Sequence, residues 1–224
     1  MKTQGLTAIV IGATGLVGSS LLQKLLEDSR YDGVITLSRK RIPDPLPKHH
    51  NYIADLFDPS TYREQLEGDH LFICTGTTKD KTPDPKEYYR IEHDLPLQVA
   101  QVALEKGVDT VVVVSALGAD PDSRFEYNRG KGAMERDIEK LGFKHCYFAQ
   151  PAIIGGEREE KRTFESLWKS FQKIIDPLLI GSLKKYRTIQ PGVISQAMIE
   201  VAVNGYPKNR IESDELKDVV SIQS

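Results

Sequence analysis

Short apolar runs alternate with longer amphipathic segments along most of the chain. Runs rich in Val, Ile and Leu predict strands that are buried on both faces of a sheet, because such side chains fill a pleated surface well. These predicted strands are Ala8–Ile11, Val34–Leu37, Tyr52–Ala54, Leu71–Cys74, Thr110–Val114 and His145–Ala149.

Segments with apolar residues at three- and four-residue spacing lie between the strands and predict helices. The predicted helices are Leu16–Leu26, a stripe that starts at Ile91 and ends near Gly107, Arg124–Leu141 and Val193–Val203. Pro96 lies inside the second stripe, which predicts a kink or a late helix start. Gly130 and Gly132 are poor helix formers, and we expect a neighbouring segment to approach the third helix closely there.

This alternation predicts a single α/β domain over residues 1–224. The expected fold is a doubly wound, Rossmann-type parallel sheet of about six to seven strands with helices on both faces. Residues 151–224 are less regular, and we expect them to cap the pocket and to contribute its substrate side. An apolar stripe from Phe164 to Ile175 predicts a helix that covers the sheet or the pocket, or else a partner surface.

Composition narrows the classes of function. The 224 residues are 39% hydrophobic and 28% charged, as in an ordinary folded domain, and the net charge is only −2. A nearly neutral chain provides no global field for nucleic acid, so no nucleic-acid partner is expected. No apolar run reaches the roughly 18 residues that a membrane span needs. Two cysteines indicate a reducing compartment, and a cytoplasmic location is expected.

Three glycines follow the first strand directly, in the spacing Gly-x-x-Gly-x-x-Gly. Gly12 permits the tight turn, Gly15 lets the backbone approach a pyrophosphate, and Gly18 lets the helix pack against the strand. The helix that follows offers free N–H groups to phosphates. A purely structural turn is the alternative, but this position between strand and helix favours a dinucleotide. The expected cofactor contacts in this loop are Gly12, Thr14, Gly15, Leu16, Val17 and Gly18.

The second strand ends in Leu37-Ser38-Arg39-Lys40-Arg41, which places a hydroxyl and three cations there. An acidic residue there would accept the ribose hydroxyls of NAD, whereas cations suit the additional 2′-phosphate of NADP. NADP(H) is therefore preferred, with NAD(H) as the alternative cofactor. A solvated surface run is the competing interpretation of the basic residues.

Two further loops follow the third and fourth strands. Asp55 and Leu56 are positioned to meet the adenine, although a capping role for Asp55 is nearly as well supported. The small-residue loop Thr75-Gly76-Thr77-Thr78 would let a cofactor lie close to the backbone, with Thr75, Gly76 and Thr77 as the expected contacts. The pair His49-His50 lacks a surrounding cluster of ligands, so no metal site is expected.

A catalytic arrangement follows the fifth strand. Tyr127 and Lys131 are four residues apart and share one face of a helix, so the lysine can lower the pKa of the tyrosine. Tyr127 would pass a proton to a substrate carbonyl oxygen, and Lys131 would also hold the nicotinamide ribose. Ser115, at the carboxyl end of the strand, would hold that oxygen by a hydrogen bond. A surface pair is the alternative for the tyrosine and lysine alone.

The motifs GATGLVG, SRKR, CTGTT, SALGAD and YNRGK together resemble the short-chain dehydrogenase/reductase superfamily. Within it the chain is most similar to the atypical short branch with the Tat-interacting-protein-type oxidoreductases. The resemblance implies an NADP(H)-binding Rossmann domain with Ser115, Tyr127 and Lys131 as the catalytic residues. It also places Pro151 and Ile153 beside the nicotinamide.

The resemblance also suggests the substrate side of the site. Family members carry an Arg-Pro pair where this chain has Gln150-Pro151. The expected substrate contacts are Ser115, Ala116, Leu117 and Gln150. A homodimer is compatible with the superfamily.

We therefore expect an NADP(H)-dependent oxidoreductase that acts on a small carbonyl or alcohol substrate. A non-enzymatic NADP(H)-binding redox sensor is the alternative, because the fold alone does not establish turnover. An epimerase or dehydratase is a weaker alternative, because the larger enzymes of that type carry a longer carboxyl-terminal lobe.

Overall fold

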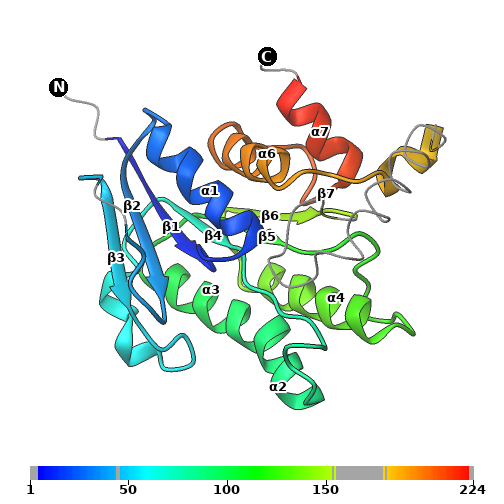
Figure 1. The fold of residues 1–224 in the computed structure, drawn as a ribbon, viewed down its shortest axis with the longest axis horizontal. Coiled ribbons are helices and arrows are strands. Elements are labelled where there is room, and N and C mark those ends of the chain that lie inside the picture. The colour runs from blue at the N-terminus through cyan, green and yellow to red at the C-terminus, as the bar shows by residue number, and fades with distance from the viewer. Residues whose placement is uncertain (1–4, 44–45, 153, 155–178, 180, 222–224) are drawn as a thin grey trace.

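Seven parallel strands form one sheet in the part of the chain that the computed structural model describes, residues 5–43, 46–152, 154, 179 and 181–221 (Figure 1). Their order across the sheet is β3-β2-β1-β4-β5-β6-β7. The strands are β1 Leu6–Ile11, β2 Tyr31–Ser38, β3 His49–Ile53, β4 His70–Ile73, β5 Thr110–Val114, β6 His145–Gln150 and β7 Arg210–Glu212. The doubly wound α/β fold expected from the alternating pattern is thus confirmed.

Helices cover both faces of this sheet (Figure 1). One face carries α1 Leu16–Glu27, α6 Pro191–Asn204 and α7 Ser213–Ser221, and the other carries α2 Pro85–Tyr89, α3 Leu95–Glu105 and α4 Glu126–Glu139. Short 3₁₀ turns span Pro59–Thr61, Arg63–Gln65 and Gly181–Tyr186. Ala8 and Val10 of β1 enter the hydrophobic core under α1 and α6, whereas Ile9 and Ile11 enter the core under α3. Because both faces are buried, the strands show uninterrupted apolar runs in the sequence.

The third strand and the last two elements differ from the sequence prediction. The run Tyr52–Ala54 predicted a strand, but β3 begins earlier, at His49. As the edge strand it has a half-exposed pattern, so polar residues take ladder positions there. The strand β7 and the helix α7 were not predicted. Ile211 is the one apolar residue of β7, and its side chain enters the core with residues of α6 and α7 while the strand pairs with β6.

The chain between β4 and β5 is helical but irregular. The helix α2 passes through a π-helical turn, Arg90–Asp94, before α3 begins. Pro96 lies in the first turn of α3, but the chain is already helical through the π turn before it. The irregularity expected at this proline is therefore a change of helix type and not a late helix start. The π turn buries Glu92 and His93, which are 3% and 6% exposed. Single π turns of this kind are frequent at functional sites.

The two glycines of α4 behave differently. A Cβ atom on Gly132 would lie 2.2 Å from the backbone carbon of Asp120, so a neighbouring segment does approach the helix there. A Cβ atom on Gly130 would meet nothing within 4 Å. The prediction of close approach is therefore confirmed at Gly132 and wrong at Gly130.

The strand order reverses between β1 and β4. The loops that follow these two strands touch, since Cys74 N–H donates to the Ile11 carbonyl at 2.8 Å. In open α/β sheets ligands bind in the crevice at this reversal, beyond the carboxyl ends of the strands. No helix among the described residues is both long enough and apolar enough to cross a membrane. The predicted stripe from Phe164 to Ile175 lies outside the described residues.

Candidate functional site

The glycine loop after β1 is closely packed in the way its spacing predicts. Gly12 has a φ of +81°, and a Cβ atom there would lie 2.7 Å from the carbonyl of Cys74. A Cβ atom on Gly18 would lie 2.1 Å from the Gly12 carbonyl oxygen. Side chains are thus excluded at both positions, and α1 begins at Leu16 directly against the loop. Its first N–H groups, which no helical carbonyl can reach, face the crevice.

A cleft of about 590 Å³ lies at this crevice. Ten residues expected to bind cofactor or substrate line it together: Thr14, Gly15, Leu16, Val17, Thr75, Gly76, Thr77, Ser115, Tyr127 and Lys131. The lining also includes Thr78, which belongs to the expected small-residue loop. Further lining residues, which the sequence did not single out for the site, are Ser19, Cys74, Lys81, Glu92, Val114 and Ile154. Gly12 and Gly18 lie behind the loop and shape it. Ile153 lies outside the described residues.

The cleft suits a ligand that is polar and partly anionic. Oγ1 of Thr75 is buried and has no hydrogen-bond partner among the described residues. The first turn of α1 carries no acidic residue that would compete for its N–H groups. An anion is stabilised at such a helix terminus. These features fit a dinucleotide whose pyrophosphate lies against the glycine loop.

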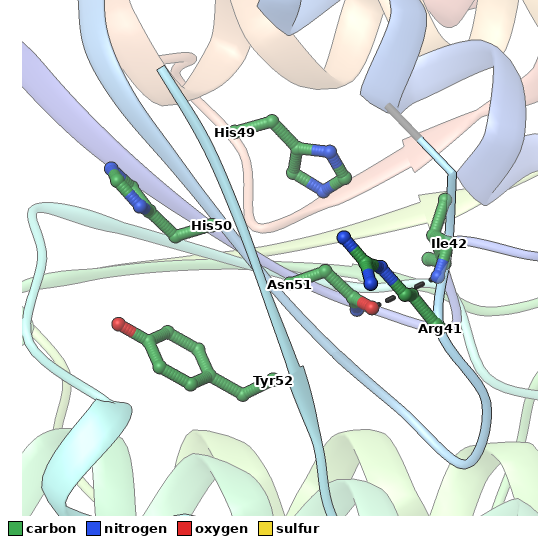
Figure 2. A pocket seen from close by; sticks show the side chains of 6 residues that line it. All are labelled: Arg41, Ile42, His49, His50, Asn51 and Tyr52. Carbon is green, nitrogen blue, oxygen red and sulfur yellow. Dashed lines mark hydrogen bonds between the residues drawn. The ribbon is translucent and has the colours of Figure 1, made fainter. Parts of the chain in front are cut away.

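The basic loop after β2 is fixed by a polar network on β3. Ser38 Oγ donates to the Lys40 carbonyl at 2.6 Å and accepts from Asn51 Nδ2 at 2.8 Å. Asn51 Oδ1 also accepts from the N–H of Ile42 at 2.9 Å, as Figure 2 shows. Because its hydroxyl is engaged internally, Ser38 shapes the loop rather than presenting a free donor.

Arg39 and Lys40 are exposed on this loop, and neither forms an ion pair with a described residue. Arg41 lines a small polar pocket of about 290 Å³ beside Asn51 and His49 (Figure 2). The loop thus offers cations beyond the end of β2, but it does not line the main cleft. Arg41 belongs to the expected basic run, and Asn51 extends the expected set of residues here.

Asp55 and Leu56 do not line the cleft either. Asp55 Oδ1 accepts from the N–H of Phe57 at 3.0 Å, so its carboxylate closes a local turn. The capping role belongs to Asp58, which accepts from Ser60 N–H at 3.0 Å and begins the 3₁₀ turn. The predicted capping role of Asp55 is therefore wrong, and Asp55 closes the turn that precedes the capped one.

A second cavity, of about 440 Å³, adjoins the cleft. Its lining is Ala116, Leu117, Gly118, Tyr127, Asn128, Pro151, Ala152, Lys185, Tyr186 and Glu212. Tyr127 is 43% exposed and borders both spaces. A phenol in this position can reach a molecule in the second cavity and a molecule in the cleft at the same time.

Lys131 follows Tyr127 by one helical turn and is buried. Its Nζ lies 2.7 Å from Oε2 of Glu92, and the Thr77 N–H donates to the other oxygen of that carboxylate. Burial lowers the pKa of Lys131, but the adjacent Glu92 carboxylate outweighs this effect, and the net pKa is raised. Lys131 is therefore a permanent cation in the cleft wall.

Ser115 is bound to a second buried carboxylate, Glu135. The Ser115 hydroxyl donates to Oε1 of Glu135, and Gln150 Nε2 donates to the same oxygen at 2.9 Å. Arg210 Nε donates to Oε2 at 2.8 Å. Gln150 thus lines neither cavity, contrary to its expected role as a substrate contact, because its amide is committed to Glu135.

Glu92 and Glu135 are the main residues that sequence reasoning missed. Glu135 had a usable signal, since it lies one turn beyond Lys131 and two turns beyond Tyr127 on the same helical face. Glu92 had none, because the π turn changes the face on which it lies. No group of residues suited to hold a metal ion occurs among those described.

A family model and several relatives match the sequence of this chain. Residues 8–134 match the model of the NAD dependent epimerase/dehydratase family. The mitochondrial protein FMP52 of Saccharomyces cerevisiae is 36% identical over 161 residues, which cover 70% of this chain and 69% of the relative. The mitochondrial protein fmp52 of Aspergillus niger is 31% identical over 204 residues, covering 87% and 86%.

Solved structures of low identity share the fold. MoeE5, in complex with UDP-glucose and NAD, has a TM-score of 0.66 at 14% identity and covers 96% of this chain and 81% of its own. The UDP-glucose 4-epimerase of Thermotoga maritima has a TM-score of 0.67 at 15% identity, covering 97% and 82%. At these identities the likeness establishes the fold alone.

Two expectations change in the light of these relatives. The expectation of a cytoplasmic location was wrong, because the relatives are named as mitochondrial proteins. Two cysteines indicate a reducing environment without identifying the compartment. The relatives also carry the FMP52 name and not that of the Tat-interacting-protein branch, so the comparisons do not support that finer assignment.

Proposed function

The chain belongs to the NAD-dependent epimerase/dehydratase family, whose members share a nucleotide-binding Rossmann fold of the short-chain dehydrogenase/reductase type, and we propose that it is an NADP(H)-dependent oxidoreductase. Its substrate would be a small carbonyl compound or the corresponding alcohol. One observation carries the proposal: Tyr127 borders both the cleft and the second cavity, with the Lys131 cation on the same helical face.

The cofactor would lie along the main cleft. The glycine loop and the amino terminus of α1 would hold the pyrophosphate, and Oγ1 of Thr75 would gain a polar partner. Arg39 and Lys40 would hold the 2′-phosphate, which favours NADP(H) over NAD(H). Pro151 would lie beside the nicotinamide ring. When bound, the nicotinamide supplies or accepts the hydride.

The chain's own residues would manage the proton and the substrate. Tyr127 would donate its proton to the substrate oxygen in reduction and accept it in oxidation. Lys131 would anchor the ribose hydroxyls from the cleft wall. Ala116 and Leu117 would shape the substrate cavity, whose lining they share with Tyr127.

Ser115 fits a role that differs from simple donation to a carbonyl. Its hydroxyl donates to Glu135, so its oxygen is free to accept a hydrogen bond. An alcohol substrate or the Tyr127 phenol would supply that bond. Donation to a carbonyl oxygen would require the hydroxyl to turn away from Glu135.

An epimerase or dehydratase is a second candidate, and the family match supports it. In such a reaction the cofactor would be regenerated within each cycle. Consumption of NADPH in proportion to product would exclude it. The relatives' names also lead us to infer a mitochondrial location, which imaging of the tagged protein would test.

The direct test is a screen of small aldehydes, ketones and alcohols, followed by the absorbance of reduced nicotinamide. We expect Tyr127→Phe to lower turnover by about 10²–10⁴-fold and to leave NADPH binding intact. Tyr89→Phe is the matched control, because Tyr89 is similarly exposed, at 44%, and lines neither cavity. Turnover that survives Tyr127→Phe would refute the proposed role. Binding of NADPH without turnover of any substrate would favour the redox sensor.

A further inference from the structure

Two carboxylate contacts set the surroundings of Lys131. The side chains of Lys131 and Glu92 are only 5% and 3% exposed, and they face each other from α4 and the π turn. One Glu92 oxygen lies 2.7 Å from the ammonium, and the other accepts the N–H of Thr77. Both oxygens of the Glu92 carboxylate therefore have a contact, one with α4 and the other with the loop after β4.

We propose that Glu92 is a positioning residue of this site, which holds the Lys131 ammonium at the cleft and compensates its charge, so that Tyr127 faces an ion pair instead of a lone cation. The catalytic meaning of this inference rests on the proposed function. The electrostatic effect of Glu92 on the pKa of Tyr127 does not depend on the proposed function.

The consequence concerns the proton of Tyr127. A lone buried cation one helical turn away stabilises a phenolate and would lower the tyrosine pKa by one unit or more. An ion pair has a much weaker field, because the two charges oppose each other. Tyr127 would then keep its proton at neutral pH and act as an acid. The electrostatic effect expected of Lys131 from the sequence would be largely cancelled.

The other charged groups near this pair already have partners. Glu126 pairs with Lys79 at the surface, and Glu135 is bound to Ser115, Gln150 and Arg210. The titratable and charged groups around the pair are Tyr88 on α2, His93 and Asp94 on the π turn, Glu126, Tyr127, Glu135 and Asp137 on α4, and Lys79 and Lys81 after β4. Among the carboxylates of the described residues, Glu92 is the one in an ion pair with Lys131.

The test measures Tyr127 itself. Protein labelled with ¹³C in its tyrosine rings would be titrated by NMR without cofactor or substrate, with Tyr127→Phe assigning the resonance. We expect Glu92→Gln, which preserves shape and removes the charge, to lower the Tyr127 pKa by about one unit. An unchanged titration in Glu92→Gln would overturn the proposal.

A double variant separates the effect of the Lys131 charge from any other effect of the substitution at Glu92. Glu92→Gln with Lys131→Met removes both buried charges, and the Tyr127 pKa should return to within a few tenths of a unit of wild type. A rise of about one unit or more in the double variant would show that Lys131 acts uncompensated in the native protein, and would refute the inference. Because the titration needs no turnover, failure of the proposed oxidoreductase function would be seen separately, in the substrate screen.

Discussion

The hydroxyl of Ser115 donates its proton to Oε1 of Glu135, so the serine at the end of β5 is held by the helix that carries Tyr127 and Lys131. Glu135 is 1% exposed, and Gln150 and Arg210 satisfy its remaining acceptor positions. One buried carboxylate thus ties β5, β6 and β7 to α4. The orientation of Ser115 depends on this carboxylate.

Glu135→Ala should destabilise the protein strongly. The change leaves the Gln150 amide and the Ser115 hydroxyl buried without an acceptor, and we expect a loss of about 2–4 kcal/mol in the free energy of unfolding. Glu139→Ala is the control, because Glu139 also pairs with Arg210 at 2.9 Å but is 40% exposed. That surface pair should contribute less than about 1 kcal/mol. Urea denaturation of both variants checks the difference, and equal losses would contradict it.

Gly18→Ala should disrupt the cofactor loop. Its Cβ atom would lie 2.1 Å from the Gly12 carbonyl oxygen, so the backbone of the loop has to move. We expect a loss of NADPH affinity of at least about tenfold together with a lower Tm. Gly130→Ala, where a Cβ atom meets nothing within 4 Å, should raise stability by about 0.5–1 kcal/mol and leave affinity unchanged. Calorimetry measures the stability of the two variants, and fluorescence titration measures their affinity for NADPH. Normal NADPH binding by Gly18→Ala would contradict the assignment of this loop to the cofactor.

Both cysteines should be inert in the folded protein. Burial raises the pKa of the Cys74 and Cys146 thiols to about 12. Cys146 is buried and Cys74 is partly exposed at the cleft, and in both the reactive thiolate is a small minority at pH 8. We expect a chromogenic disulfide reagent to label both residues in guanidinium and neither in native protein within minutes. Rapid native labelling that Cys74→Ser removes would show that the cleft exposes a reactive thiol.

The fold was predictable because its determinants are local. Each central strand is buried on both faces and so appears as an unbroken apolar run, such as Thr110–Val114. The glycine loop was equally clear, because close backbone approaches leave room for glycine alone at Gly12 and Gly18. The edge strands were less predictable, since only the end of β3 was expected and β7 was not expected at all. β3 and β7 take their strand character from the neighbour they pair with, and their own residues are largely polar.

The partners of the candidate catalytic residues depend on tertiary contacts. The spacing of Ser115, Tyr127 and Lys131 predicted a shared site, and all three line one cleft. Nothing local indicated that Glu92, from a π turn thirty-nine positions before Lys131, would pair with it. Likewise, Arg210 reaches Glu135 across seventy-five positions of sequence. Such contacts follow from the packing of whole elements.

The most direct measurement of the central claim is a fluorescence titration of the protein with NADPH and, separately, with NADH. Wild type should bind NADPH more tightly, and Arg39→Glu should weaken NADPH binding by about 10–100-fold while changing NADH binding only slightly. Lys144→Glu, the same reversal of charge on an exposed residue before β6, is the control and should change neither. Tighter binding of NADH, or equal weakening of both nucleotides, would contradict the assignment of the 2′-phosphate to the loop after β2. Failure to bind either nucleotide would contradict the proposed function as a whole.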